Sequence, residues 1–278
     1  MTNVPSRKMN DGNEIDQIGL GLWRVDDEKQ CNLAIKSALQ EGYRHFDSAQ
    51  IYGNEEFLGN ALQEAYKENS DLKREDLFIT TKLWNDNQFY DQVIPAFEQS
   101  LANLQTDYVD LFLVHFPVTE TRRPAWRKME EIKESGRAKS IGVSNYTVKH
   151  LEELLKECDI KPAVNQVEIH VYLQQHELRE YCADKGIVVE AYSPLAHGYG
   201  LDNEALNKIA FKYGKTGPQI MLRWCIQMNM VVLPKSINPS RIKENFDIFD
   251  FSLDEEDLAL IADLESNYRT CWDPTNVA

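Results

Sequence analysis

The chain has 278 residues, enough for one large domain or two smaller ones. Its 45 acidic and 30 basic residues give a net charge of −15, which argues against nucleic acid and anionic membrane surfaces as partners, because both attract basic patches. With 42% hydrophobic and 27% charged residues, the composition is typical of a soluble globular protein. An anionic small ligand is compatible with this charge where basic residues cluster locally.

Five cysteines are spread along the chain without a CxxC pair or a metal-ligand spacing. They are Cys31, Cys158, Cys182, Cys225 and Cys271. We expect reduced, buried thiols, no metal site and a cytoplasmic protein. The N-terminus lacks the apolar core of a signal peptide, and no apolar run approaches the ~18 residues needed to span a bilayer.

The chain is predicted to begin with a β-hairpin over residues 5–18, which turns at Asp11-Gly12-Asn13. Short apolar segments then alternate with segments of helical spacing. The predicted strands cover residues 19–23, 44–49, 77–83, 110–116, 138–144, 163–170, 187–193 and 230–235. The predicted helices cover residues 26–41, 55–67, 92–104, 126–135, 147–158, 176–185, 203–213, 218–227, 239–246 and 254–264.

This alternation of strands and helices predicts an α/β protein with a parallel sheet. Apolar runs such as residues 111–114 suit strands that are buried on both faces. Eight such units closing on themselves give a (β/α)8 TIM barrel preceded by an N-terminal β-hairpin. A doubly wound sheet is the alternative, but it usually carries a glycine-rich turn, and the chain has no GxGxxG. Without repeats or linkers, we expect a single domain over residues 1–278.

Four side chains that can transfer protons follow three consecutive strands, where a barrel of this kind places its active site. Asp47 ends the second strand, Tyr52 lies on the following loop, Lys82 ends the third strand and His115 ends the fourth. We expect the Lys82 ammonium to lower the pKa of Tyr52, which is ordinarily near 10. Asp47 would orient Lys82, and His115 would donate a hydrogen bond to a carbonyl oxygen.

A lone lysine or histidine at a strand end is more often solvated or part of a core than catalytic. The convergence of four such groups favours a joint role. We interpret His45 as structural, and His150, His176 and His197 as solvated. The loop after Tyr52 is predicted to enter a helix through Asn54, a good N-cap residue.

A local basic run follows the last strand, where Lys235 and Arg241 flank the start of a helix. A helix N-terminus with basic side chains is an anion site, and a phosphate is its natural occupant. The alternative is a solvated basic helix. Tyr192 could stack on a flat ring, and Ser144, Asn145 and Gln166 could grip a carboxamide. Together they suggest a nicotinamide across the barrel mouth.

The sixth strand places Gln166, Glu168 and His170 on one face. A metal-dependent hydrolase using Asp47, His115, Glu168 and His170 is therefore an alternative reading of the strand ends. Lys82 is difficult to accommodate in such a site, and the basic run at 235–241 has no role in it.

The chain resembles the aldo-keto reductase family from about Ile18 to its C-terminal segment. The segments that carry the resemblance are GYRHFDSAQIYGNEEFLG (42–59), TTKLW (80–84), LFLVHFP (111–117), IGVSNY (141–146), NQVEIH (165–170), AYSPL (191–195) and LPKSINPSRIKENFDIFDF (233–251). The short loops are similar to those of microbial and protozoan members, such as diketogluconate reductases and prostaglandin F synthases.

The resemblance implies a barrel that uses NADPH to reduce aldehydes and ketones to alcohols. It implies a catalytic tetrad with Tyr52 as general acid, made of Asp47, Tyr52, Lys82 and His115. It implies cofactor contacts from Leu22, Trp23, Asp47, Ser144, Asn145, Gln166, Tyr192, Ser193, Leu195, Lys235, Ser236, Ile237, Arg241, Glu244 and Asn245. It implies substrate contacts from Trp23, Tyr52, Trp84, His115, Phe116 and Trp272.

Four departures from the family pattern concern the substrate pocket. Phe116 stands where many members have Trp, and His197 stands where many have a small residue that touches the cofactor pyrophosphate. The loop between Pro117 and Trp126 and the C-terminal tail are both short. The expected partner is thus a small carbonyl compound of unspecified identity, and the family default is a monomer. A non-catalytic NADPH-binding regulatory or structural relative is the alternative function.

Overall fold

The computed structural model describes residues 4–278, and its centre is an eight-stranded parallel sheet in which neighbouring strands follow chain order from β3 to β10. The strands are β3 (Leu20–Gly21), β4 (His45–Asp47), β5 (Phe78–Leu83), β6 (Val109–Val114), β7 (Ala138–Ser144), β8 (Val164–Glu168), β9 (Val188–Tyr192) and β10 (Val231–Leu233). The α-helices are α1 (Glu28–Glu41), α2 (Glu55–Glu68), α3 (Val93–Leu104), α4 (Arg122–Glu134), α5 (Val148–Glu157), α6 (His176–Lys185), α7 (Glu204–Tyr213), α8 (Gly217–Gln227), α9 (Pro239–Phe246) and α10 (Glu255–Ala262). Short 3-10 helices are η1 (Gln50–Tyr52), η2 (Arg74–Asp76), η3 (Asn85–Asn87) and η4 (Ala196–Gly198).

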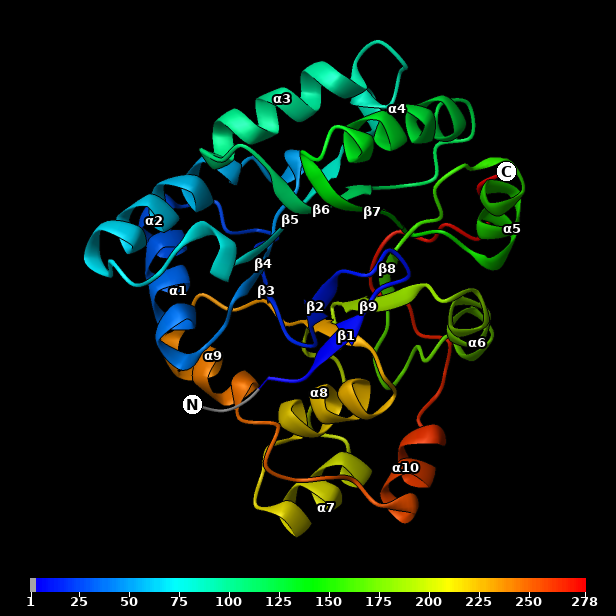
Figure 1. Cartoon of the computed structure of the whole chain (residues 1–278). Helices are drawn as coiled ribbons and strands as arrows, with labels where there is room; N and C mark the ends of the chain where they lie inside the picture. The colour runs from blue at the N-terminus through cyan, green and yellow to red at the C-terminus, as the bar shows by residue number, and fades with distance from the viewer. Residues whose placement is uncertain (1–3) are drawn as a thin grey trace.

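The sheet closes on itself between its first and last strands. Parallel bridges pair Ile18 with Val232 and Gly21 with Lys235. Gly19 lies in this seam, where an added Cβ would come within 2.7 Å of the His45 ring and 2.8 Å of Leu233, so only glycine fits. The helices surround the strands in Figure 1. The predicted (β/α)8 barrel is confirmed, and the doubly wound alternative is wrong because the two edge strands meet.

The N-terminal hairpin closes one end of the barrel. Strands β1 (Ser6–Lys8) and β2 (Glu14–Asp16) pair antiparallel, and they cross the centre of the strand ring in Figure 1. Met9 and Ile15 are buried in one cluster with residues of β6, β8, β9 and β10. Asn10 donates to the carbonyl of Pro162, just before β8, with an N–O distance of 2.8 Å. Because the N-terminal ends of the strands are covered, a ligand must enter at their C-terminal ends.

Two local predictions differ from the structure. Helix α4 begins at Arg122, four residues before its predicted start, because Pro124 falls in the first turn, where a missing N–H costs no helical hydrogen bond. Asn54 stands at the N-cap of α2, but its side chain does not cap the helix. It donates to the carbonyls of Leu22 and Val25 and accepts from Ser48, so it ties the loops after β3 and β4 together.

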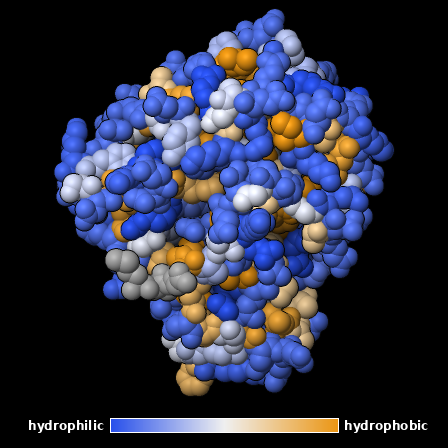
Figure 2. All heavy atoms as spheres, viewed as in Figure 1, coloured by the Kyte–Doolittle hydropathy of each residue, from blue (hydrophilic) through white to orange (hydrophobic). Residues whose placement is uncertain are grey.

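The face shown in Figure 2 is mostly hydrophilic, with hydrophobic side chains in small scattered groups. Within residues 4–278, none of the helices is both long and apolar enough to cross a membrane. All five cysteines are free; Cys31, Cys182 and Cys225 are buried, and Cys158 and Cys271 are half-buried.

Candidate active site

The C-terminal ends of β4, β5 and β6 bring Asp47, Tyr52, Lys82 and His115 together. The Lys82 ammonium is fully buried and lies 2.6 Å from Oδ1 of Asp47 and 3.3 Å from the hydroxyl of Tyr52. It also donates to the Ser48 carbonyl at 2.9 Å, so each of its three protons has an acceptor. The Tyr52 and His115 rings meet edge to face with centroids 5.7 Å apart. One lysine therefore organises the cluster.

Burial dominates the electrostatics of this cluster. Burial raises the pKa of Tyr52, and the Lys82 ammonium only partly offsets that rise. Lys82 thus acts on the Tyr52 pKa in the expected direction, but burial has the larger effect. Burial by itself lowers the pKa of Lys82, but Asp47 and Tyr52 outweigh it and raise that pKa. Burial and Lys82 hold the pKa of His115 well below 6.5, so its imidazole is neutral at pH 7. A neutral phenol and a neutral imidazole thus face a cationic lysine.

A second polar layer lies beneath the tetrad. The amide of Gln166 on β8 donates to Oδ2 of Asp47 at 2.8 Å and to Oε2 of Glu190 on β9 at 3.1 Å. With both amide protons donated to the Asp47 and Glu190 side chains, the Gln166 side-chain oxygen is left as the available acceptor. The sequence reasoning did not select Glu190. In the sequence, the one indication of its role is that a carboxylate stands within the apolar strand 188–192, two residues before Tyr192 and on the same face.

The side chains expected to bind a carboxamide also contact one another. Asn145, with a φ of 64°, donates to the carbonyl of His115 at 2.9 Å and to the Ser144 hydroxyl at 3.1 Å. Its oxygen accepts from the hydroxyl of Tyr192 at 2.7 Å. This chain of contacts fixes the Tyr192 ring at the mouth beside the end of β8. Ser144, Asn145, Gln166 and Tyr192 therefore form one wall of the site.

The basic run at the last strand end is exposed. Lys235 follows β10, and Arg241 lies in the first turn of α9, whose N-cap is Asn238. Within the described residues, neither cation forms an ion pair or a side-chain hydrogen bond, although the net charge of the chain is −15. Nearby, Ser236 and Asn245 are buried, Ile237 is half-buried, and Glu244 accepts from Thr216. Two free cations at a helix N-terminus fit a phosphate.

Aromatic side chains surround the mouth. Trp84 lies 5.2 Å from His115 and 5.6 Å from Trp272, and Phe116 lies 6.3 Å from Trp272, between ring centroids. On the other side, Trp23 stacks on His197 at 5.4 Å. Leu22, buried before Trp23, donates its N–H to the Asp47 carbonyl. The half-buried Ser193 side chain contacts His197, and half-buried Leu195 immediately precedes the short helix η4.

The predictions for three of the remaining histidines agree with the structure, and the prediction for one does not. His45 is fully buried, as expected for a structural residue, and contacts Thr80 at 3.1 Å. The prediction that His150 is solvated is wrong, because it is 1% exposed and its ring reaches the Thr147 cap and the Val277 carbonyl. His176 and His197 are exposed as predicted.

The metal-hydrolase reading has no geometric support. Glu168 and His170 face the C-terminal segment, and across residues 4–278 no group of three or more His, Cys, Asp or Glu side chains is arranged around a metal position.

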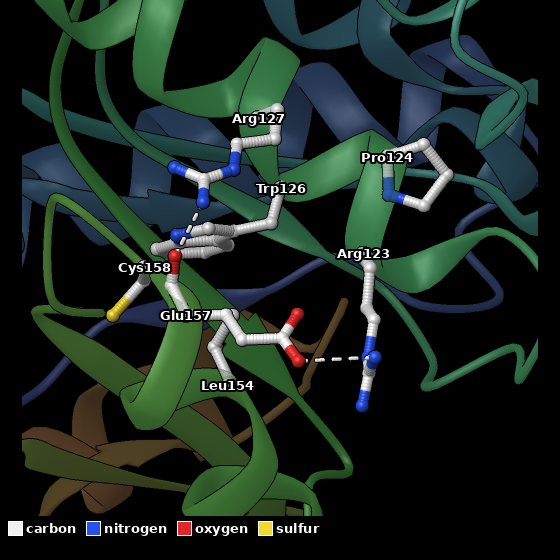
Figure 3. Close-up of a pocket in the computed structure, with 7 residues that line it drawn as sticks. All are labelled: Arg123, Pro124, Trp126, Arg127, Leu154, Glu157 and Cys158. Atoms are coloured by element: carbon white, nitrogen blue, oxygen red, sulfur yellow. Dashed lines mark hydrogen bonds and ion pairs between the residues drawn. The ribbon is translucent and has the colours of Figure 1, made fainter.

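A pocket on the outer surface of the barrel, between α4 and α5, is distinct from this site (Figure 3). It contains none of the predicted site residues. Its arginines are already engaged: Arg123 pairs with Glu157 at 3.0 Å, and Arg127 donates to the Glu157 carbonyl.

The model of the Aldo/keto reductase family matches residues 17–266 of this chain. The chain belongs to the aldo/keto reductase family. It is similar to the glyoxal reductase of Bacillus subtilis (strain 168), with 46% identity over 267 residues that cover 96% of this chain and 95% of the relative. It is also similar to the methylglyoxal reductase of Escherichia coli O157:H7, with 44% identity over 278 residues that cover 99% and 98%.

Among solved structures, an aldo-keto reductase complexed with NADPH matches with a TM-score of 0.94 and 36% identity, covering 98% of this chain and 91% of that one. The predictions of an oxidoreductase of this family, acting on carbonyl compounds with NADPH, are confirmed by these comparisons. The roles of the individual residues stay predictions, which the geometry above supports.

Proposed function

We propose that this aldo-keto reductase acts on small, reactive aldehydes and α-dicarbonyls of the glyoxal and methylglyoxal type, through a tetrad formed by Asp47, Tyr52, Lys82 and His115. The observation that carries the proposal is the buried Lys82 ammonium between the Asp47 carboxylate and the Tyr52 hydroxyl. Two relatives at 46% and 44% identity are named for these two substrates, which supports the substrate class.

When bound at the mouth, NADPH would supply the hydride that reduces the substrate carbonyl carbon. Tyr52 holds its proton at neutral pH, because burial raises its pKa, and it can donate that proton to the carbonyl oxygen. Lys82 then stabilises the phenolate that remains. Neutral His115 can donate a ring N–H to the same oxygen and fix its direction. Asp47 keeps Lys82 charged and oriented.

The cofactor residues support the same arrangement. The Gln166 oxygen and the Asn145–Ser144 pair are suited to bind a carboxamide, and the Tyr192 ring is suited to stack on the nicotinamide. The free cations Lys235 and Arg241 are suited to the 2′-phosphate that distinguishes NADPH from NADH. Trp84, Phe116 and Trp272 would enclose a small carbonyl substrate. We further propose a single domain that acts as a monomer in the cytoplasm.

The direct test measures NADPH oxidation with methylglyoxal and with an aromatic aldehyde, in wild type and in Tyr52→Phe. We expect Tyr52→Phe to bind NADPH normally and to lose about 100- to 10,000-fold in kcat, because it lacks the donated proton. Tyr66→Phe is the matched control, because it deletes a hydroxyl on α2 that has no hydrogen-bond partner within the described residues. Full turnover by Tyr52→Phe would refute the assigned acid. Binding of NADPH by wild type without turnover of any carbonyl would favour the non-catalytic alternative.

A further inference from the structure

Glu168 is a buried carboxylate that the proposed chemistry does not use. It ends β8, it is 0% exposed, and its register partner on β9 is Tyr192. It therefore lies beside the proposed nicotinamide wall but points away from the tetrad, towards the C-terminal segment. Burying a carboxylate is costly unless it is paired and hydrogen-bonded, so its partners indicate what it does.

Its partners come mainly from one irregular stretch of the chain. Oε1 of Glu168 accepts from the backbone N–H and the hydroxyl of Thr270, both at 2.6 Å, and Oε2 accepts from the N–H of Cys271 at 3.1 Å. Arg269 lies 3.7 Å from Oε2, and His170 lies 3.2 Å from Oε1. These bonds lower the pKa of Glu168 although burial alone would raise it. The carboxylate thus holds two successive residues of the segment.

The next residue is Trp272, which carries the segment over the mouth. Its ring contacts Trp84 at 5.6 Å and Phe116 at 6.3 Å, and Trp84 in turn contacts His115. Trp272 is 56% exposed, so packing on the core alone does not fix it. The two hydrogen-bonded N–H groups at Thr270 and Cys271 are the nearest anchor to its backbone.

We propose that Glu168 is a positioning residue that clamps residues 269–272 across the barrel mouth and thereby determines which carbonyl compounds fit beneath Trp272. The inference rests on the proposed function, because it takes Trp272 as a wall of the substrate pocket. The ligand class it concerns is the bulky, aromatic carbonyl compound, whose ring must pass or contact Trp272. A small dicarbonyl depends less on contact with Trp272.

The clamp is tested first by hydrogen exchange at the Thr270 and Cys271 amides, in wild type and in Glu168→Gln. A charge-assisted hydrogen bond corresponds to about 10- to 100-fold in an equilibrium, so we expect exchange to accelerate by that factor. Glu265→Gln is the matched control: Glu265 is an exposed carboxylate that accepts from the N–H groups of Gln174 and Asn267 in the same region, without touching residues 269–272. It should leave both amides unchanged. Unchanged exchange in Glu168→Gln would overturn the clamp.

The consequence for specificity is tested by kinetics on the NADPH-loaded enzyme. Glu168→Gln should raise KM for an aromatic aldehyde about tenfold or more, change KM for methylglyoxal less, and leave the Kd for NADPH within about twofold. In a Trp272→Ala background, Glu168→Gln should have no further effect on the aromatic aldehyde. An equal rise in KM for both substrates, or an additive effect with Trp272→Ala, would overturn the proposal.

A milder pair keeps the test valid if Glu168→Gln does not fold. Thr270→Val removes one of the three segment bonds, and Thr270→Ser restores its hydroxyl. We expect the KM for the aromatic aldehyde to rise in the first variant and to recover in the second. Failure of the proposed function looks different: wild type would then turn over no carbonyl, whereas the amide exchange would still depend on Glu168.

Discussion

Nε2 of His45 lies 3.7 Å from Oε1 of Glu190 beneath the tetrad, and both side chains are fully buried. Burial raises the pKa of Glu190 to about 8 and lowers the pKa of His45 to about 3. Asp47 adds to the rise at Glu190, and Lys82 adds to the fall at His45. At pH 7 this contact therefore joins two neutral groups and is no salt bridge.

The neutral Glu190 predicts a pH dependence of stability. Its folded pKa of about 8 exceeds the ordinary 4.5, so between these values the folded state binds more protons, and its contribution to the free energy of unfolding falls as pH rises. His45 acts oppositely, but its effect fades above its ordinary pKa of 6.5, and it is the same in wild type and variant. As the pH rises from 6.5 to 8.5, Glu190→Gln should therefore become more stable relative to wild type. The difference in the free energy of unfolding should grow by about 1.4 kcal/mol for each pH unit below the folded pKa. Urea unfolding at both pH values measures this gain. Glu177→Gln, at an exposed position of α6, should show no such gain.

Replacing Lys82 by Met should disable the enzyme and weaken the fold. Asp47 would remain as a buried carboxylate without its cation, which costs about 3–5 kcal/mol. The proton transfer from Tyr52 would lose its stabilising charge, so kcat should fall by about 100-fold or more. Lys128→Met is the control, because the contacts of Lys128, an ion pair with Glu131 and a cation–π contact with Tyr90, lie outside the site. Wild-type kcat in Lys82→Met would contradict the assigned role.

Arg241→Ala should weaken the preference for NADPH over NADH. One charge-assisted contact to the 2′-phosphate corresponds to about 10- to 100-fold in affinity. Fluorescence titration with both cofactors gives the ratio of their Kd values, and only the NADPH value should rise. Lys243→Ala, two residues further along α9, is the matched control. An unchanged ratio in Arg241→Ala would remove this residue from the phosphate site.

Gly19→Ala should destabilise the closed barrel. The new Cβ would overlap the His45 ring at 2.7 Å and Leu233 at 2.8 Å, and overpacking of this kind costs about 1–3 kcal/mol. Because His45 also contacts Glu190, we expect a lower urea midpoint accompanied by a changed pH dependence. A midpoint equal to that of wild type would show that the seam tolerates the methyl group.

The parts of the molecule that follow from periodicity were predicted well. The strand-helix alternation gave the barrel, and the rule that barrels carry chemistry at their C-terminal strand ends brought Asp47, Lys82 and His115 to one place. Contacts between residues distant in the sequence were not predictable. Asn54 looks like a helix cap from its neighbours alone, but its amide is used by loops about thirty residues away. His150 was predicted to be solvated, because the sequence does not show that the Val277 carbonyl contacts its ring.

The balance of effects on the Tyr52 pKa was not predictable either, for a related reason. Sequence adjacency indicated a nearby cation but gave no measure of burial, and burial has the larger effect. Glu190 was missed because a single carboxylate in an apolar strand has no motif around it, and only the register with Gln166 on β8 shows its purpose.

The closure of the barrel at Gly21 and Lys235 has a consequence for the nascent chain during synthesis. The bridge joins segments that are made more than 200 residues apart, and the last strand is followed directly by the cations of α9. The proposed nucleotide site is therefore incomplete in the nascent protein until the helices that follow the last strand have emerged. From that moment, a nucleotide bound at the proposed Lys235 site would also hold the first strand against the last, so the supply of cofactor would affect the lifetime of the protein as well as its rate.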